Sequence, residues 1–269
     1  MRILLCGDVV GKTGRDAITD NVPLLRRRLG LDFVVVNGEN AAHGFGITDK
    51  ICKSFFAAGV DVITTGNHVW NRREVMDYIR IEPRLLRPIN FAEGAPGNGI
   101  GIYPAGNRRV LVMNPMGRLF MGPVDDPFAA IDGVLKQHRL GETVDAILLD
   151  VHAEATSEKA AIAHYVDGRV TAVVGTHSHV PTADARVLPG GTAFQTDLGM
   201  CGDYDSVIGM RKDLAVARFL ESGVKPRLEP AEGPATLCGL LVDTDDATGR
   251  AVRVQPIRQG GGLEPAMPV

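Results

Sequence analysis

The sequence predicts an α/β protein built on a largely parallel β-sheet. Apolar runs of strand length, rich in Val and Ile, recur along the chain between segments of helical periodicity. Such runs are typical of strands covered on both faces, and strand–helix–strand alternation favours parallel pairing with right-handed crossovers. The 269 residues contain no internal repeat or long linker. We therefore expect a single domain over residues 1–269, with a loose Pro- and Gly-rich tail at 259–269.

The predicted strands fall into two groups. The buried strands of the parallel sheet are Arg2–Gly7, Phe33–Gly38, Asp61–Gly66, Ala146–Val151 and Ala172–Gly175. After about residue 86, shorter runs divided by Gly, Pro and Asn predict partly antiparallel strands: Pro88–Ala92, Gly99–Tyr103, Val110–Asn114, Arg186–Leu188, Gly191–Gln195, Thr236–Asp243 and Arg250–Ile257. A second sheet packed on the first is the expected arrangement.

Four helices are predicted between these strands. The first joins the first two strands, where apolar residues recur on one helical face from Ile18 to Leu29. Thr13 and Asp16 have the spacing of a capping box at its start, and Pro23 predicts a kink or a break inside it. The others are expected over Thr48–Ala58, Asn71–Ile79 and Ser157–Val166.

Charge and cysteine content exclude several classes of protein. The formal net charge is −3, so no global basic field indicates a nucleic-acid-binding protein. A nucleotide substrate stays compatible, because bound metal ions can supply positive charge locally. The cysteines are scattered, without a C-x-x-C pair, and are expected to be reduced and buried: Cys6, Cys52, Cys201 and Cys238. The first apolar run is too short for a signal peptide or a membrane span, so a cytoplasmic protein is expected.

Metal-capable side chains follow the core strands. They are Asp8 after the first strand, Glu39 and Asn40 after the second, Asn67 and His68 after the third, His152 after the fourth, and His177 and His179 after the fifth. Ligands bind at the carboxyl edge of an open α/β sheet, so these groups are expected to meet there. Mixed oxygen and nitrogen donors suit Fe, Mn or Zn.

Each of these residues has an ordinary structural explanation when taken alone. Asp8 could cap the following helix, Asn40 and Asn67 could form turns, and His152 could be a hydrogen-bonded core histidine. Two carboxylates, two carboxamides and several imidazoles at five strand ends exceed what these explanations need. Together they predict a site with more than one metal ion.

Two other motif-like stretches carry less weight. The run from Gly7 to Thr13 resembles a phosphate-binding P-loop, but its first glycine falls one residue late, which disfavours a nucleoside triphosphatase. Gly97-x-Gly99-x-Gly101 lacks the strand before it and the helix after it that a dinucleotide-binding motif requires. His43, His138 and His164 are left over, and of these only His43 lies in a loop that could reach a substrate.

The order of these residues resembles the calcineurin-like metallophosphoesterases, and more closely the YmdB branch of that superfamily. The matching stretches are GDVVGKTGR (Gly7–Arg15), NGENAAHGFGIT (Asn37–Thr48), GNHVW (Gly66–Trp70), HAEATSEK (His152–Lys159), GTHSHVPTAD (Gly175–Asp184) and TDLGMCG (Thr196–Gly202). The sequence departs from the broad superfamily pattern in three places. The usual first histidine ligand is replaced by Val10, the bridging aspartate by Glu39, and the acid after the G-N-H motif by Val69.

The resemblance implies a fold, a cofactor and a reaction. The fold would be a four-layer αββα sandwich with two central mixed sheets. The cofactor would be two metal ions, iron or alternatively manganese. One would be held by Asp8, Glu39 and His179. The ligands implied for the other are Glu39, Asn40, Asn67, His152 and His177. The reaction would be hydrolysis of phosphodiesters, in particular 2′,3′-cyclic nucleotides, by metal-bound hydroxide, with His68 as the proton donor to the leaving group or a hydrogen-bond donor to the phosphate.

Other functions and partners remain open at this point. A phosphomonoesterase or a hydrolase of linear phosphodiesters would use the same site. A nucleotide- or RNA-binding regulatory protein with little turnover would retain binding after its metals are stripped. A metal-dependent amidohydrolase would cleave amides or esters and is disfavoured by the asparagine ligands. We expect a small phosphodiester or nucleotide as the partner, with no membrane association and no stable nucleic-acid complex. The sequence is compatible with a homo-oligomer.

Overall fold

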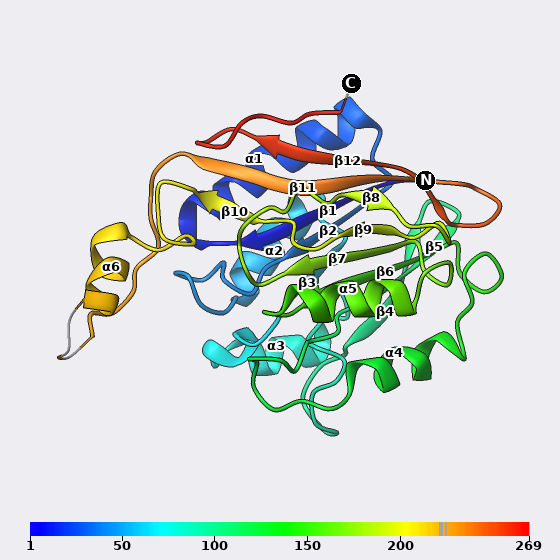
Figure 1. Ribbon diagram of the computed structural model, residues 1–269, viewed down its shortest axis with the longest axis horizontal. Helices are drawn as coiled ribbons and strands as arrows, with labels where there is room; N and C mark the ends of the chain where they lie inside the picture. The colour runs from blue at the N-terminus through cyan, green and yellow to red at the C-terminus, as the bar shows by residue number, and fades with distance from the viewer. Residues whose placement is uncertain (221–222, 224, 269) are drawn as a thin grey trace.

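The structure is a computed structural model that describes residues 1–220, 223 and 225–268. Two six-stranded sheets pack face to face and are enclosed by helices, which gives the predicted layers of helix, sheet, sheet and helix (Figure 1). The helices are α1 (Gly11–Leu29), α2 (Asp49–Ala57), η1 (Val69–Asn71), α3 (Val75–Ile81), α4 (Pro127–Leu135), α5 (Thr156–Tyr165) and α6 (Lys212–Leu220). Helix α6 stands apart from the four layers (Figure 1).

The first sheet has the strand order β12-β11-β10-β1-β2-β3. Its strands are β1 (Arg2–Val9), β2 (Phe33–Asn37), β3 (Val62–Thr64), β10 (Met200–Asp203), β11 (Ala235–Thr244) and β12 (Ala251–Gln259). Strand β1 runs parallel to β2 and β10 and antiparallel to β11, so the sheet is mixed. The carboxyl ends of β1, β2 and β3 therefore lie at one edge.

The second sheet has the order β4-β5-β6-β7-β9-β8. Its strands are β4 (Ile100–Ala105), β5 (Arg108–Met113), β6 (Ala146–His152), β7 (Ala172–Thr176), β8 (Arg186–Val187) and β9 (Ala193–Gln195). The pairs β5–β6, β6–β7 and β7–β9 are parallel, whereas β4 and β8 close the two edges in antiparallel pairs.

Alternating side chains explain why the sheets are buried on both faces. In β1, Leu4 and Cys6 pack toward α1 and α2, whereas Ile3 and Leu5 face the other sheet. Successive side chains of a strand point to opposite faces, so a strand covered on both faces must be apolar throughout. The second sheet follows the same rule against α4 and α5.

The first helix differs from its prediction. It begins at Gly11, with Val10 at the N-cap position and no side-chain cap, so Thr13 lies inside the helix and the predicted capping box is wrong. The helix also runs through Pro23 without a break. Its buried face from Ile18 to Leu29 packs on the first sheet on both sides of the proline, which compensates for the lost hydrogen bond.

Other elements were predicted wrongly or were not predicted. Pro88–Ala92 forms no strand, and the pairing in this region consists of isolated bridges at Leu85 and Leu86. The sequence pattern did not predict α4, α6 and β10. The tail expected to be loose folds back, because Ala266 and Arg258 exchange two backbone hydrogen bonds of 2.7 and 3.0 Å. In the described part of the chain, no helix has the length and apolarity needed to cross a membrane.

Candidate metal centre

The seven predicted ligands come together where strands of both sheets end. Asp8 lies in β1, His152 ends β6, and the other five follow β2, β3 and β7: Glu39, Asn40, Asn67, His177 and His179. Strands β1 and β7 contact each other, so the carboxyl edges of the two sheets meet at this point. Sequence positions as far apart as 8 and 179 thereby become neighbours.

Three groups converge on one nitrogen of His152. Glu39 Oε1, Asn67 Oδ1 and His177 Nδ1 each lie 3.0 Å from His152 Nε2. One ring nitrogen carries at most one hydrogen and cannot satisfy three partners at once. Ligand atoms of Glu39, His152 and His177 also lie within 4.8 Å of one another. Such crowding of donor atoms fits a metal ion better than a set of hydrogen bonds.

A second group of atoms lies beside the first. His179 Nε2 is 3.8 Å from Asp8 Oδ1 and 3.1 Å from the side-chain amide of Asn40. The same amide is 3.2 Å from Glu39 Oε1, so Glu39 contacts both groups. Asn40 thus contacts His179 and Glu39 through its amide nitrogen, whereas the resemblance assigned it to the group around His152.

Asp8 has an unsatisfied oxygen in the interior. Its carboxylate is fully buried, and Oδ1 has no hydrogen-bond partner among the described residues. Burial raises the pKa of Asp8 to about 6, against the opposing effect of the nearby histidines. A buried carboxylate oxygen without a partner is costly unless a cation binds it. This oxygen therefore supports a metal position next to Asp8.

Glu39 and His152 form a buried ion pair in this structure. Burial acts to raise the pKa of Glu39, but the imidazole of His152 outweighs it and lowers this pKa to about 2. Burial likewise acts to lower the pKa of His152, but Glu39 raises it to about 9. Burial and the positive His152 lower the pKa of His177 to about 3, so His177 is neutral and able to ligate. A metal ion would take the place of the His152 proton.

Unusual backbone geometry presents these side chains. His177 and His179 have φ values of 97° and 66°, a left-handed region that non-glycine residues seldom adopt. Only glycine fits at position 66, directly before Asn67, because a Cβ there would lie 2.1 Å from the ring of His152. Strain of this kind is concentrated at functional sites, where the surrounding structure enforces it.

A hydrogen bond at Nδ1 fixes the tautomer of His152 and of His179. Thr176 Oγ1 donates to Asp150 Oδ1 at 2.7 Å and lies 2.9 Å from His152 Nδ1, so it accepts the hydrogen of that nitrogen. In the same way, His179 Nδ1 donates to the carbonyl of Ile208 at 2.8 Å. With a metal ion in place of the His152 Nε2 proton, the ring nitrogens opposite these donors would carry lone pairs that face the ligand groups.

His177 has its own partner, which the sequence pattern did not identify. Its Nε2 lies 3.2 Å from Glu154 Oε2, and this contact turns Nδ1 toward His152. Asp150, Glu154 and Thr176 had no signal in the sequence beyond their position next to predicted ligands. Only the folded chain reveals their partners.

A buried ion pair supports the loop that carries His177 and His179. Lys159 Nζ lies 2.7 Å from Asp197 Oδ2, and both side chains are 1% exposed. Asp197 also accepts from the backbone N–H groups of Ser178 and Gly199, at 3.2 and 2.9 Å. The carboxylate thus ties the histidine loop to α5 and to the turn before β10.

A cavity of about 600 Å³ opens onto the ligand groups. His68 lines it together with Glu39, His177 and His179. The backbone N–H of His68 donates to Glu39 Oε2 at 3.1 Å, and its ring meets the ring of Phe45 edge-on at 5.0 Å between centroids. His68 is therefore held beside the ligands with its ring at the cavity wall.

Comparison with known proteins identifies the family of this chain. The sequence profile of the family described as YmdB-like protein matches residues 4–257. The chain belongs to this family. It is 47% identical over 257 residues to a protein of Bacillus subtilis strain 168 named 2′,3′-cyclic-nucleotide 2′-phosphodiesterase, with 96% of each chain covered. The predicted membership is confirmed.

Two solved structures of similar chains share the fold. The crystal structure of a hypothetical protein from Thermus thermophilus matches with a TM-score of 0.91 and 42% identity, covering 97% of this chain and 100% of the other. A crystal structure described as a novel phosphatase from Mycoplasma pneumoniae matches with a TM-score of 0.89 and 32% identity, covering 97% and 93%. The predicted metallophosphoesterase fold and enzyme class are confirmed.

Proposed function

We propose that this member of the YmdB-like family is a dinuclear metal-dependent phosphodiesterase. The observation that carries the proposal is the pair of adjoining ligand groups that share Glu39. In one group, Asn67 and His177 lie with Glu39 around Nε2 of His152. The other contains Asp8, Asn40 and His179. Glu39 Oε1 contacts both groups, which supports Glu39 as a ligand that the two cations would share.

The chemistry of the donors narrows the choice of metal. Carboxylate, carboxamide and imidazole groups without a thiolate favour iron or manganese over a soft metal. When bound, two such cations supply charge stabilisation for phosphoryl oxygens and lower the pKa of water toward neutrality. The unsatisfied Asp8 oxygen and the crowding at His152 support this cofactor from the geometry of the chain itself.

We assign to His68 the role of proton donor to the leaving oxygen. Its ring lies at the wall of the 600 Å³ cavity, and its backbone is fixed by the hydrogen bond to Glu39. An imidazole can donate a proton or a hydrogen bond to an oxygen of the substrate. Phe45 packs against the ring and restricts its orientation.

The substrate is proposed to be a 2′,3′-cyclic nucleotide. The name of the Bacillus subtilis relative supports this class. The cavity suits a nucleotide, because it combines the ligand groups with the apolar side chains of Phe45, Met210 and Phe219. Arg218 and Lys225 add positive charge to its wall. Apolar surface can contact the base while the cations face the phosphate.

The proposal is tested by metal analysis together with hydrolysis of bis-p-nitrophenyl phosphate and 2′,3′-cyclic AMP. We expect about two iron or manganese ions per chain and turnover that a chelator abolishes. A Glu39→Gln variant should bind less metal than the parent protein. Hydrolysis of phosphomonoesters alone would favour a phosphatase. Absence of metal and of turnover after reconstitution would instead indicate a binding or regulatory protein.

A further inference from the structure

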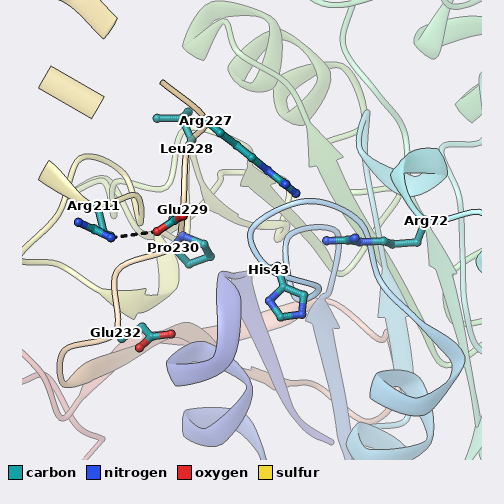
Figure 2. Close-up of a pocket in the computed structure, with 8 residues that line it drawn as sticks. All are labelled: His43, Arg72, Arg211, Arg227, Leu228, Glu229, Pro230 and Glu232. Atoms are coloured by element: carbon teal, nitrogen blue, oxygen red, sulfur yellow. Dashed lines mark hydrogen bonds and ion pairs between the residues drawn. The ribbon is translucent and has the colours of Figure 1, made fainter. Parts of the chain in front are cut away.

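A second cavity of about 710 Å³ adjoins the one that contains the metal-ligand candidates. Leu228 lines both cavities. Figure 2 shows that Arg72 and Arg227 reach toward one another from opposite walls of the second cavity, above the ring of His43. None of these three residues has a part in the proposed metal chemistry.

Positive charge is concentrated at one end of this cavity. Arg211, at the other end, forms an ion pair with Glu229 at 2.9 Å (Figure 2). It also pairs with Asp213 at 2.7 Å, so its charge is compensated. Among the residues that the structure describes, neither Arg72 nor Arg227 forms an ion pair with a carboxylate. Two like charges that face one another across a cavity repel, and an anion between them removes that cost.

One loop separates the two cavities. Gly44 and Phe45 line the first cavity, whereas His43 lines the second. Arg72 fixes this loop, since its Nε donates to the carbonyl of Phe45 at 3.1 Å and its Nη2 to that of Ala42 at 2.6 Å. The Arg72 guanidinium is therefore held in place before any ligand arrives. Preorganisation of this kind lowers the entropic cost of binding.

We propose that the cavity between Arg72 and Arg227 binds a second phosphate of the substrate, the one on the 5′ side of the ribose. The inference rests on the proposed function and deepens it by naming the substrate class. On a nucleotide, the 5′ oxygen and the 2′,3′-cyclic phosphate lie on opposite sides of one ribose. A ribose at the junction of the two cavities beside Leu228 would therefore present one phosphate to each cavity. Guanidinium groups match the geometry and charge of phosphate.

The substrate class that follows is a nucleotide with both a 2′,3′-cyclic phosphate and a 5′ phosphate. Two sources carry this chemistry. One is a 5′-phosphorylated mononucleotide, and the other is the 3′-terminal residue of a short RNA fragment, whose 5′ phosphate links it to the preceding residue. Both substrates present the negative charge of a 5′ phosphate to Arg72 and Arg227, and this phosphate is the group that the site recognises.

The test compares three substrates with the metal-loaded enzyme: 2′,3′-cyclic AMP, its 5′-phosphorylated form, and a dinucleotide that ends in the same cyclic phosphate. We expect kcat/KM to be on the order of 10- to 100-fold higher for at least one of the two longer substrates. Arg227→Ala should remove this advantage and leave hydrolysis of 2′,3′-cyclic AMP within about twofold. Arg227→Lys keeps the charge and should retain part of the advantage. Arg253→Ala, on the exposed side of β12, is the matched control and should change neither value.

Failure of the inference can be distinguished from failure of the proposed function. Equal kcat/KM for all three substrates, or an advantage that survives Arg227→Ala, would overturn the second phosphate site. If the enzyme hydrolyses none of them, calorimetric binding of adenosine 5′-monophosphate and adenosine decides the matter. Tighter binding of the phosphorylated ligand that Arg227→Ala abolishes would support the site, and equal binding would overturn it.

Discussion

Replacing Lys159 by methionine removes one half of the buried ion pair that supports the histidine loop. Lys159 and Asp197 are each 1% exposed and lie 2.7 Å apart. The substitution keeps most of the side-chain volume but leaves the Asp197 carboxylate buried without its counterion. Breaking a buried pair in this way costs roughly 3–5 kcal/mol of unfolding free energy. Since a domain is stabilised by only about 5–15 kcal/mol, this loss is a large share.

The assay is urea unfolding of the metal-free protein, because bound metal would stabilise the folded state and obscure the difference. Lys53→Met is the matched control. Lys53 pairs with Asp49 at 2.8 Å on the surface of α2, with side chains 64% and 43% exposed. Removal of this exposed pair should cost no more than about 0.5 kcal/mol.

A double variant isolates the charge effect. Lys159→Met combined with Asp197→Asn removes both buried charges, so it should be more stable than Lys159→Met alone. Recovery is expected to be partial, since the asparagine loses one of the acceptors that bind the N–H groups of Ser178 and Gly199. If Lys159→Met costs no more than Lys53→Met, the reasoning is refuted.

Three further predictions concern the metal centre. His68→Ala should lower turnover by roughly 10²–10⁴-fold while the metal content stays unchanged, and loss of both metals would contradict its role as proton donor. Asp150→Asn should lower metal affinity by roughly 10- to 100-fold, measured by titration with a competing chelator, because the amide cannot accept from both Thr64 and Thr176 and the His152 tautomer is no longer fixed. Chelation of the parent protein should lower its melting temperature in a thermal scan, since the metals bind the folded ligand set only. An unchanged melting temperature would argue against resident metals.

Most of the metal-ligand candidates could be found from the sequence because strand periodicity is a local property. A buried strand is apolar along its whole length, so Asp8 or His152 next to such a run is conspicuous. The carboxyl ends of parallel strands share an edge, so the strand pattern predicted that the candidates lie near one another. Its assignment of all five strands to one parallel sheet was wrong, because β6 and β7 belong to the second sheet. The candidates still meet because the two sheets pack with their carboxyl edges together. The same reasoning gave an α/β fold with a second sheet packed on the first and the helices α1, α2, α3 and α5, whereas the four-layer order came from the resemblance.

The boundaries of elements were less accessible, because tertiary contacts override local signals. The capping-box spacing at Thr13 and Asp16 is real, but the helix begins earlier, at Gly11, where the chain leaves β1. Pro88–Ala92 has apolar residues at strand spacing, yet it forms turns. Asp126 followed by Pro127 is a recognisable helix start that was not predicted from the sequence.

The sequence by itself determined the kinds of donor atoms in the site and the family to which the chain belongs. Only the tertiary structure decided which atoms face one another, since Asp8, Glu39 and His179 are far apart along the chain. It placed Asn40 beside His179, paired Asp150 with Thr176, and brought Arg72 and Arg227 to one cavity. The physical reason is that periodicity reports what a residue's own segment does. The partners of a side chain depend instead on how distant segments pack.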